Sequence, residues 1–558
     1  MQMLLKKFFT TLFCFYIACS LINAQEEVNS NEPPVTEPQN QGGRISGSLE
    51  TNVNFFMKDE KIGASGTPQY ERQQFGTDSW LNLNYSNWGF DFTLRYDMFN
   101  NSYLLNPTSS YSAQGIGMWS IRKKIDKLGI QVGYIYDQIG SGMIFRAFEE
   151  RPLAIDNALV GGHLTYEFNK NWKIKGFVGK QKQQFSLYNS LIKGGAIDGF
   201  IEGKNGKWTC APGFGVSSRQ YDDETMNQIV SAITTYTPVD SIGACYSTYA
   251  FSAYNTLTAG DFTWYVEGAI KSKDVFNDPF AIKTQWTGDT TFGKFVQRPG
   301  NVIYTSLSYV KGDFGINLEA KRTENFNYRA TPFTKLFQGS VNFLPSMARQ
   351  NTYRLTARYQ AATQDLGEQA FQADVRYNLT DKIGLNVNVS NITRLNNEQL
   401  YRELYSEVTY KHSKKLSFLG GLQLQYYNQE IYETKPGVEI VQTIVPYAEI
   451  LYKFTRKNSL RVELSYMDCH QDYGSWLFGL AEYSIAPHWI FTCSGMYNST
   501  PKKTADILYP TIGATYIKDS NRFAISYVKQ VQGIVCSGGI CRFEPAFSGV
   551  KMNISSTF

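Results

Sequence analysis

The sequence predicts an all-β protein, a single large antiparallel transmembrane β-barrel, and three observations lead to this fold class. The 558 residues include 37 Tyr and 37 Phe, and aromatic residues make up 15% of the chain while charged residues make up only 18%. A typical soluble protein carries about 25% charged residues. The mean hydropathy is nevertheless −0.33, which excludes a bundle of apolar membrane helices. Polar and apolar residues alternate along the chain, and short polar turns alternate with long connections.

The N-terminal residues predict an export signal. Lys6 and Lys7 precede the apolar stretch 8–22, and Ala24 then supplies a small residue for cleavage. The stretch is too short for a spanning helix of about 20 residues. A lipoprotein-type cleavage before Cys19 is the alternative, but Tyr16 fits that motif poorly. We therefore expect a signal peptide over 1–24, removed near Ala24.

Residues 25–43 are rich in Asn, Gln, Glu and Pro and show no apolar periodicity, so they predict a disordered leader. The remainder, 44–558, forms one predicted barrel domain. The formal net charge of the whole chain is +5. That small excess gives no reason to expect nucleic acid as a partner.

From residue 44 onward the pattern has a period of two, as in 90–97, 371–378 and 460–466. Successive side chains of a strand point to opposite faces, so one face of each strand is apolar and the other polar. In a membrane barrel the polar face lines the lumen. The charged residues predicted to line the lumen on this basis are Asp91, Arg95, Asp97, Asp374, Arg376, Arg461, Glu463 and Lys551.

The connections are of two kinds. Short polar turns are expected at 87–89, 127–129, 169–171, 380–382, 411–414, 456–458, 486–488 and 518–521, and long connections at 58–73, 101–114, 203–243, 273–300, 324–336 and 429–439. Short turns at one end and long loops at the other are the layout of an outer-membrane barrel. Strand patterns begin at 26 places, 337 and 352 among them, and 26 is the best count. The weaker ones near 194, 208 and 337 give a range of 22–26 strands.

The last strand carries a further signal. Val550, Met552, Ile554, Ser556 and the terminal Phe558 share one face. A final strand that ends in Phe resembles the C-terminal signature of bacterial outer-membrane barrels, in which it is read by the barrel assembly machinery. Ser556 departs from the apolar residue usual at that position. The alternative is an ordinary amphipathic edge strand that ends in Phe.

One stretch, 140–159, breaks the alternation and mixes charges with apolar residues. The leader is too short to plug a wide barrel, so loops of the barrel must fill the lumen if it is filled. Our hypothesis is that 140–159 folds into the lumen and that its charges meet Arg95 and Asp97. The alternative is an external loop with local ion pairs, which stabilise little. The charged residues of this stretch are Arg146, Glu149, Glu150, Arg151 and Asp156.

The runs 140–159, 340–355 and 535–547, together with the last strand, resemble those of a family of uncharacterised outer-membrane β-barrel proteins from Bacteroidota bacteria. The resemblance covers most of the mature chain. It implies a β-barrel fold and integral localisation in the outer membrane of a Gram-negative bacterium. It implies no activity.

Two cysteine pairs are disulfide candidates. Cys536 and Cys541 enclose a Gly-Gly turn, which brings the ends of a hairpin within the ~5.5 Å that a disulfide needs. A metal knuckle is the alternative, but no second Cys or His pair accompanies it. Cys210 and Cys245 flank the connection 203–243 and form the second candidate pair.

Asp468, His470 and Asp472 share one face at a strand end and are the one catalytic constellation that the sequence suggests. An acid, a histidine and a second acid can bind a metal or activate water. Charged rims are also normal at membrane interfaces. We therefore predict no enzyme, no cofactor and no metal.

Two functions compete. The first is a porin-like channel or transporter with its lumen narrowed by inward loops. The second is a non-conducting scaffold, or a component of a secretion or surface-assembly complex. The expected partners are outer-membrane lipid, the barrel assembly machinery, and a small solute or a secretion partner.

Overall fold

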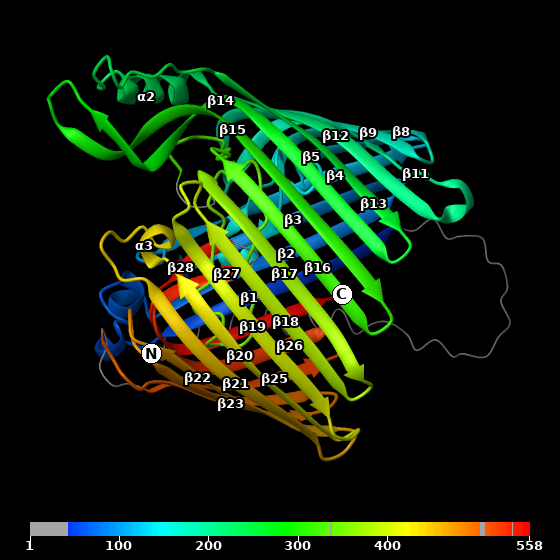
Figure 1. Cartoon of the computed structure of the whole chain (residues 1–558), viewed down its shortest axis with the longest axis vertical. Coiled ribbons are helices and arrows are strands. Elements are labelled where there is room, and N and C mark those ends of the chain that lie inside the picture. Colours follow the sequence, from blue (N-terminus) through cyan, green and yellow to red (C-terminus); the bar gives the residue numbers. More distant parts are fainter. Residues whose placement is uncertain (1–42, 335–337, 503–507, 538–539) are drawn as a thin grey trace. The chain divides into compact units, whose positions relative to one another are not determined.

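The computed structural model describes residues 43–334, 338–502, 508–537 and 540–558. The signal peptide predicted over 1–24, and the leader predicted over 25–43 except for its last residue, lie outside the described residues. In the described part, 25 strands form one antiparallel sheet. Twenty-four of them follow one another around a barrel, and the short β11 (Ile201–Glu202) pairs with an edge of β12 as an extra strand (Figure 1).

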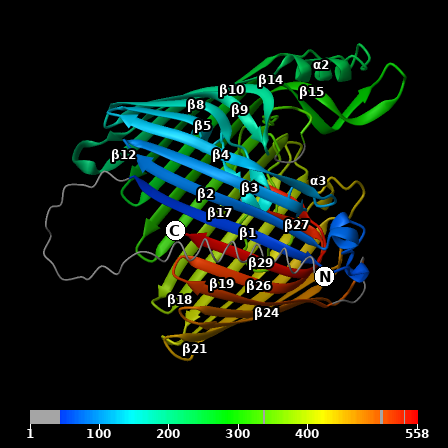
Figure 2. The ribbon, with the colours of Figure 1, turned by 180° about the vertical axis from the view of Figure 1, so that it is seen from behind.

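The barrel closes through pairing of its first and last strands. Ser48 of the first strand lies opposite Thr557 of the last, and the register continues to the Phe56–Gly549 pair (Figure 2). Closure gives each of the 24 wall strands a neighbour on both sides, which a membrane-spanning sheet requires. The barrel strands are β1 (Arg44–Phe56), β2 (Phe75–Asn87), β3 (Phe90–Ser102), β4 (Tyr111–Ile125), β5 (Leu128–Ile135), β8 (Leu159–Asn169), β9 (Trp172–Gln183), β10 (Ser186–Gly199), β12 (Trp208–Gln220), β13 (Ser247–Ala259), β14 (Phe262–Thr284), β15 (Thr290–Lys311), β16 (Phe314–Glu324), β17 (Gly367–Thr380), β18 (Ile383–Thr393), β19 (Gln399–Lys411), β20 (Leu416–Tyr427), β21 (Val441–Lys453), β22 (Asn458–Cys469), β23 (Trp476–Ile485), β24 (Trp489–Asn498), β25 (Leu508–Lys518), β26 (Asn521–Gln530) and β29 (Phe547–Thr557).

The two faces of the wall differ as the alternation predicts. On β3, Leu94 and Tyr96 are each 42% exposed, whereas Arg95 and Asp97 between them are 2% and 3% exposed. The exposed face of the other strands carries the same kind of residue, including Ile303, Leu464, Ile512 and Ile525. The face opposite to this apolar exterior is the interior face of the barrel. None of the helices in the described part of the chain has the length and hydropathy needed to cross a membrane.

The 24 strands fall within the expected range of 22–26, but the strands expected near 337 and 352 do not form. The described residues of 338–366 contain no strand. Their apolar side chains, among them Val341, Met347 and Leu355, are instead buried against the interior face of other strands. A strand in the wall would have exposed alternate side chains of this stretch to the exterior, whereas here consecutive residues such as Leu355 and Thr356, or Tyr359 and Gln360, are both buried.

A second difference from the expected structure lies at one end of the barrel. The connection expected at 273–300 is the extended hairpin of β14 and β15, whose strands continue beyond those of their neighbours (Figure 1). Helix α2 (Asp223–Ile233), part of the connection expected at 203–243, supports it. Met226 and Ile229 of α2 share a buried cluster with Val275 and Phe295 of the hairpin. This apolar support allows two strands to extend without other neighbours in the sheet.

Two connections pack against the interior face. Segment A (136–158) joins β5 to β8 and contains the two-residue strands β6 (Glu149–Glu150) and β7 (Ile155–Asp156). Segment B (325–366, without 335–337) joins β16 to β17. The two segments take part in two buried clusters. Each cluster also contains side chains from the interior face of the strands, near the end of the barrel that carries the long connections. The short elements outside the barrel wall are η1 (Glu60–Ile62), η2 (Gln69–Gln73), η3 (Arg151–Leu153), η4 (Lys204–Gly206), α3 (Gln429–Tyr432), β27 (Gly533–Ser537) and β28 (Ile540–Glu544).

Candidate functional site

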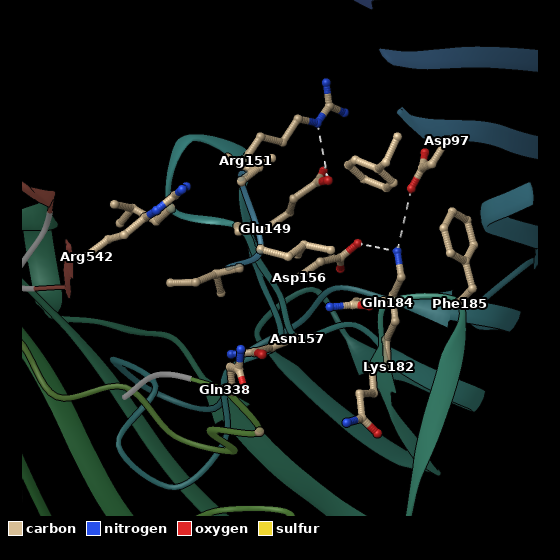
Figure 3. A pocket seen from close by; sticks show the side chains of 18 of the residues that line it. Asp97, Glu149, Arg151, Asp156, Asn157, Lys182, Gln184, Phe185, Gln338 and Arg542 are labelled. Atoms are coloured by element: carbon tan, nitrogen blue, oxygen red, sulfur yellow. Dashed lines mark hydrogen bonds and ion pairs between the residues drawn. The ribbon is translucent and has the colours of Figure 1, made fainter. Parts of the chain in front are cut away.

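An ionic network joins segment A to the barrel wall around Arg95. The guanidinium of Arg95 donates to Asp97 at 2.7 and 3.0 Å, to Glu149 at 2.7 Å and to Asp156 at 2.9 Å. Lys182 of β9 donates to Asp156 at 2.5 Å and lies 3.9 Å from Asp97 (Figure 3). Three carboxylates, two from segment A and one from β3, thus share the two buried cations Arg95 and Lys182.

The carboxyl of Asp156 shows how the network works electrostatically. Burial by itself raises the pKa of this carboxyl, but the charges of Lys182 and Arg95 outweigh that effect and hold the pKa below its ordinary value. The ionised form of Asp156 is therefore the form that fastens segment A to the wall.

The other charged residues of segment A extend these contacts. Arg151 donates to Glu50 of β1 at 2.7 Å and to Glu149 at 3.2 Å. The Arg146 guanidinium lies over the ring of Phe148, 4.7 Å from its centroid, and over that of Phe343 in segment B at 4.2 Å. Glu150 lies in β6 opposite Ile155 of β7. Segment A is therefore attached both to the wall and to segment B.

In segment B, interior-facing side chains donate to several backbone carbonyls, as Ser217 does to Ile144 O of segment A at 2.8 Å. Gln181 donates to Ser340 O at 2.6 Å, and Gln425 donates to Tyr359 O at 2.6 Å. Irregular backbone inside a barrel has no sheet partners, so its carbonyls need such donors. The other wall donors are Arg219 to Arg329 O, Lys271 to Asn327 O, Ser190 to Ala330 O, Lys321 to Pro345 O and Gln423 to Thr356 O.

Segment B also reaches a tyrosine cluster on β19 and β21. The ring centroids of Tyr353 and Tyr447 lie 4.5 Å apart, and those of Tyr405 and Tyr447 lie 5.6 Å apart. Arg349 stacks on Tyr405 at 3.9 Å. These positions lie in the middle of their strands, so segment B extends well beyond the long-connection end.

The remaining lumen candidates are spread over the interior face. Asp374 accepts from Arg376 at 3.0 Å and from Arg349 at 3.4 Å. Arg461 donates to Glu463 at 3.1 Å and also to Glu449. The structure therefore brings Arg95, Asp97, Glu149, Arg151 and Asp156 together and leaves the others in separate groups.

Two further candidates form no ion pair in the described part of the chain, although the charges of Glu544 and of Arg354 in segment B act on Lys551. Asp91, close to a short turn, accepts from Ser86 at 2.6 Å. Lys551 lies 4.4 Å from the ring centroid of Phe547. Neither contact involves segment A or segment B.

Two cavities border these segments. One, of about 230 Å³, lies between segment A, strands β2, β3, β9 and β10, and Arg542 (Figure 3). The other, of about 620 Å³, lies beside 343–350 of segment B and is lined by polar residues that include Asn317, Glu319, Asp374 and Asn388. The second cavity is the larger and carries groups of both charges.

The sequence reasoning missed Lys182, Lys271, Lys321 and Arg542. The lysines stand at interior positions of strands, where period-two alternation gives their face but not their partners. Arg542 falls in the 535–547 run that carries the family resemblance. A usable signal was present at Trp476 and Phe478, two apolar residues on the interior face of β23, where polar residues are expected; both are buried, whereas Leu477 between them is exposed on the outside.

The disulfide predicted between Cys210 and Cys245 is wrong, because both cysteines are free. Cys210 of β12 lies opposite Leu257, whereas Cys245 precedes the other end of β13, which pairs with Gln220. The two residues are therefore separated by about the length of a strand. In the hairpin of β27 and β28, Cys536 lies opposite Cys541 in the register. Their side chains lie outside the described residues, so that disulfide stays a prediction.

The acid–histidine constellation is not assembled. His470 is largely exposed, and its Nε2 lies 3.9 Å from Asp468. Asp472 instead accepts from the hydroxyl of Tyr359 in segment B at 2.8 Å. Within the described ranges, no group of three or more His, Cys, Asp or Glu residues could hold a metal ion.

A family model described as "Family of unknown function (DUF6029)" matches residues 5–558. The chain belongs to this family. No curated protein is significantly similar to this DUF6029 member.

Among solved structures, the P pilus usher PapC translocation pore is similar, with 10% identity and a TM-score of 0.41 over 92% of this chain and 99% of that chain. The siderophore receptor PirA from Pseudomonas aeruginosa has 6% identity and a TM-score of 0.39 over 93% and 81% of the two chains. OccAB3 from Acinetobacter baumannii has 8% identity and a TM-score of 0.35 over 92% and 99%. Because these scores are below 0.5, we take the function from the geometry of this chain alone.

Proposed function

We propose that this DUF6029 protein is an integral outer-membrane channel or transporter whose lumen is narrowed by segments A and B. The observation that carries the proposal is the closed 24-strand barrel, apolar outside and polar inside, with two connections packed on its interior face. Barrels of 16–18 strands already leave an aqueous channel. A wider barrel needs an internal obstruction to avoid leaking solutes.

The localisation follows from the same features. The apolar exterior contacts outer-membrane lipid, the signal peptide ending near Ala24 directs export, and the last strand with Phe558 engages the barrel assembly machinery. The backbone of Phe558 pairs with Gly47 of β1, which supports a role of the terminal strand in closure. The resemblance to Bacteroidota proteins supports an origin in that group.

Solute would pass along an interior face of mixed charge. Near the cavity of about 620 Å³, Asp374 and Glu319 stand beside Arg349 and Arg376. Rings of one charge make a pore selective for ions of the other charge. The mixed lining therefore supports a path with weak ion preference.

The alternative is a non-conducting scaffold, or a component of a secretion or surface-assembly complex. One observation favours it: the extension of β14 and β15 exposes large apolar side chains, with Phe280 at 39%, Ile282 at 53% and Trp286 at 67%. Such residues are common at protein interfaces. Stable partners that co-purify with the protein, together with an absence of conductance in every variant, would support this alternative.

Planar-bilayer conductance tests the channel. In one variant 143–156 is deleted, and in a second variant 343–358 is replaced by a Gly-Ser linker of equal length. We expect both to conduct more than the parent protein, because each loses part of the obstruction. The control replaces 434–439 of the β20–β21 connection by the same kind of linker and should leave conductance unchanged. Unchanged conductance in both test variants, with the barrel folded, would contradict the proposal.

A further inference from the structure

We propose that the cavity of about 230 Å³ beside segment A binds a small organic monoanion with one ring, an aromatic carboxylate being the simplest case. The inference deepens the proposed function, since such a molecule would be the solute or an effector of the channel. Its own support is the set of side chains that line the cavity (Figure 3). They come from segments A and B, four barrel strands, the β3–β4 and β9–β10 connections, and β28.

The charges of the lining are unequal. Four cationic residues line the cavity, namely Arg95, Arg151, Lys182 and Arg542, against the three carboxylates Asp97, Glu149 and Asp156, so the lining carries a net charge of 4 − 3 = +1. The first three cations all form ion pairs with these carboxylates or with Glu50.

Arg542 is the cation in excess. Its guanidinium donates to the backbone carbonyls of Pro152 and Tyr103, both at 3.2 Å. The charges of Glu544 and Asp78 act on Arg542, but neither carboxylate forms an ion pair with it in the described part of the chain. The residue is only 9% exposed. A buried charge is costly unless an opposite charge pairs with it directly, and an anion in the cavity would supply that partner. In Figure 3 the side chain of Arg542 reaches the cavity from the side opposite Lys182 and Phe185.

A second donor lacks a partner. Asn157 lines the cavity and is 5% exposed, and its Nδ2 has no hydrogen-bond acceptor among the described residues. Buried amide groups are almost always satisfied. A carboxylate has two oxygens and only accepts hydrogen bonds, which suits a guanidinium and an amide N–H.

Part of the remaining wall is aromatic. Trp80 and Phe99 meet edge to face with centroids 5.9 Å apart, and Phe99 meets Phe185 in the same way at 6.0 Å. Tyr188 also lines the cavity, and further lining residues are the aliphatic Leu104, Leu105, Leu153 and Ile155 and the amides Gln184 and Gln338. Such a wall favours a flat apolar body. The volume of about 230 Å³ is below the ~300 Å³ at which pockets for drug-sized ligands begin, which limits the ligand to about one ring.

Calorimetric titration of the purified full-length barrel tests the site with three probes of one shape and different charge: benzoate, benzamide and benzylamine. We expect benzoate to bind at least tenfold more tightly than either of the others. Arg542→Gln should weaken benzoate binding tenfold or more, because a charge-assisted hydrogen bond is lost. Arg542→Lys should restore part of the affinity, and Phe185→Ala should weaken benzoate binding by removing a ring from the wall.

The matched control is Arg72→Gln, which removes an exposed arginine of η2 outside the cavity and should leave binding unchanged. Equal binding of benzoate and benzamide, or equal affinities of the Arg542→Gln and Arg72→Gln variants, would overturn the inference. The gel mobility of unboiled protein verifies that each variant is folded. Benzoate binding without conductance would contradict the channel alone, and conductance without benzoate binding would contradict this site alone.

Discussion

Segments A and B both bury apolar side chains in the barrel, but they differ in their ionic contacts. Besides its buried Ile139, Met143 and Phe145, segment A is fastened by ion pairs, with Glu149 and Asp156 meeting Arg95 and Lys182. Segment B packs like a protein core, with Met347, Leu355 and Tyr359 in a buried cluster. Ion pairs respond to pH and to removal of one charge, whereas a packed core responds to lost volume. Segment A is therefore the better suited of the two to open under changed conditions.

The largest effect is expected for Arg95→Gln. This substitution leaves Asp97, Glu149 and Asp156 without their shared cation, and breaking a buried pair costs about 3–5 kcal/mol. Urea unfolding in detergent, followed by tryptophan fluorescence, measures the loss, and conductance should rise as segment A loosens. Arg122→Gln, which changes an exposed arginine on β4, is the matched control. A loss no greater than that of the control would show that the network does not hold segment A.

Met467→Ala is the corresponding test of segment B. Met467 is fully buried in the cluster with Met347 and Leu355. Truncating a buried methionine costs about 2–5 kcal/mol, because a cavity remains. The same unfolding assay measures it, with Met98→Ala on the exposed face of β3 as the control of smaller effect. Equal losses for the two methionines would contradict a packed interior at this site.

Acidification should separate the two segments. The pKa of Asp156 is lowered, so the stability that its ionised form contributes is fully present above the ordinary Asp value of about 3.9 and is lost as pH falls through the lower folded value. Protease cleavage of segment A should therefore increase below about pH 4, while segment B stays protected. Asp156→Asn should make this cleavage independent of pH in that range. Simultaneous exposure of both segments would mean that they are released as one unit.

The smallest effect is expected for Asp91→Asn. Asp91 lies on the same polar face as Arg95 but near a short turn, exposed and bonded only to Ser86 among its described contacts. Exposed polar substitutions change stability by about 0.5 kcal/mol or less. The urea midpoint should stay within that limit. A loss comparable to that of Arg95→Gln would show that a charge on the polar face, and not its burial, sets the effect.

Much of the fold could be read from alternation. The residues 90–97 show their two faces directly, and the short turns at 169–171 and 486–488 lie between the expected strands. Segment B could not be read in this way. Its run 352–361 contains apolar residues at strand-like spacing, and spacing alone does not distinguish a strand of the wall from a segment that packs inside the barrel.

Of the candidate site, the sequence supplied the charged residues of 140–159 and their hypothesised partners Arg95 and Asp97. It did not supply Lys182 or Arg542, because each is brought to the cavity by pairing between residues far apart in the chain. Arg542, for example, contacts Pro152 across 390 residues. Contacts of that kind depend on the closure of the barrel.

The sequence by itself determined the fold class, the direction in which each strand side chain points and the end of the barrel that carries long connections. These follow from local rules, since a period of two and the length of a turn need no distant partner. Only the tertiary structure decided the number of strands, the conformation of 338–366 and the groups that meet Arg95. These three features depend on which surfaces are covered once the first and last strands pair, and the pattern of residues along the chain does not specify that.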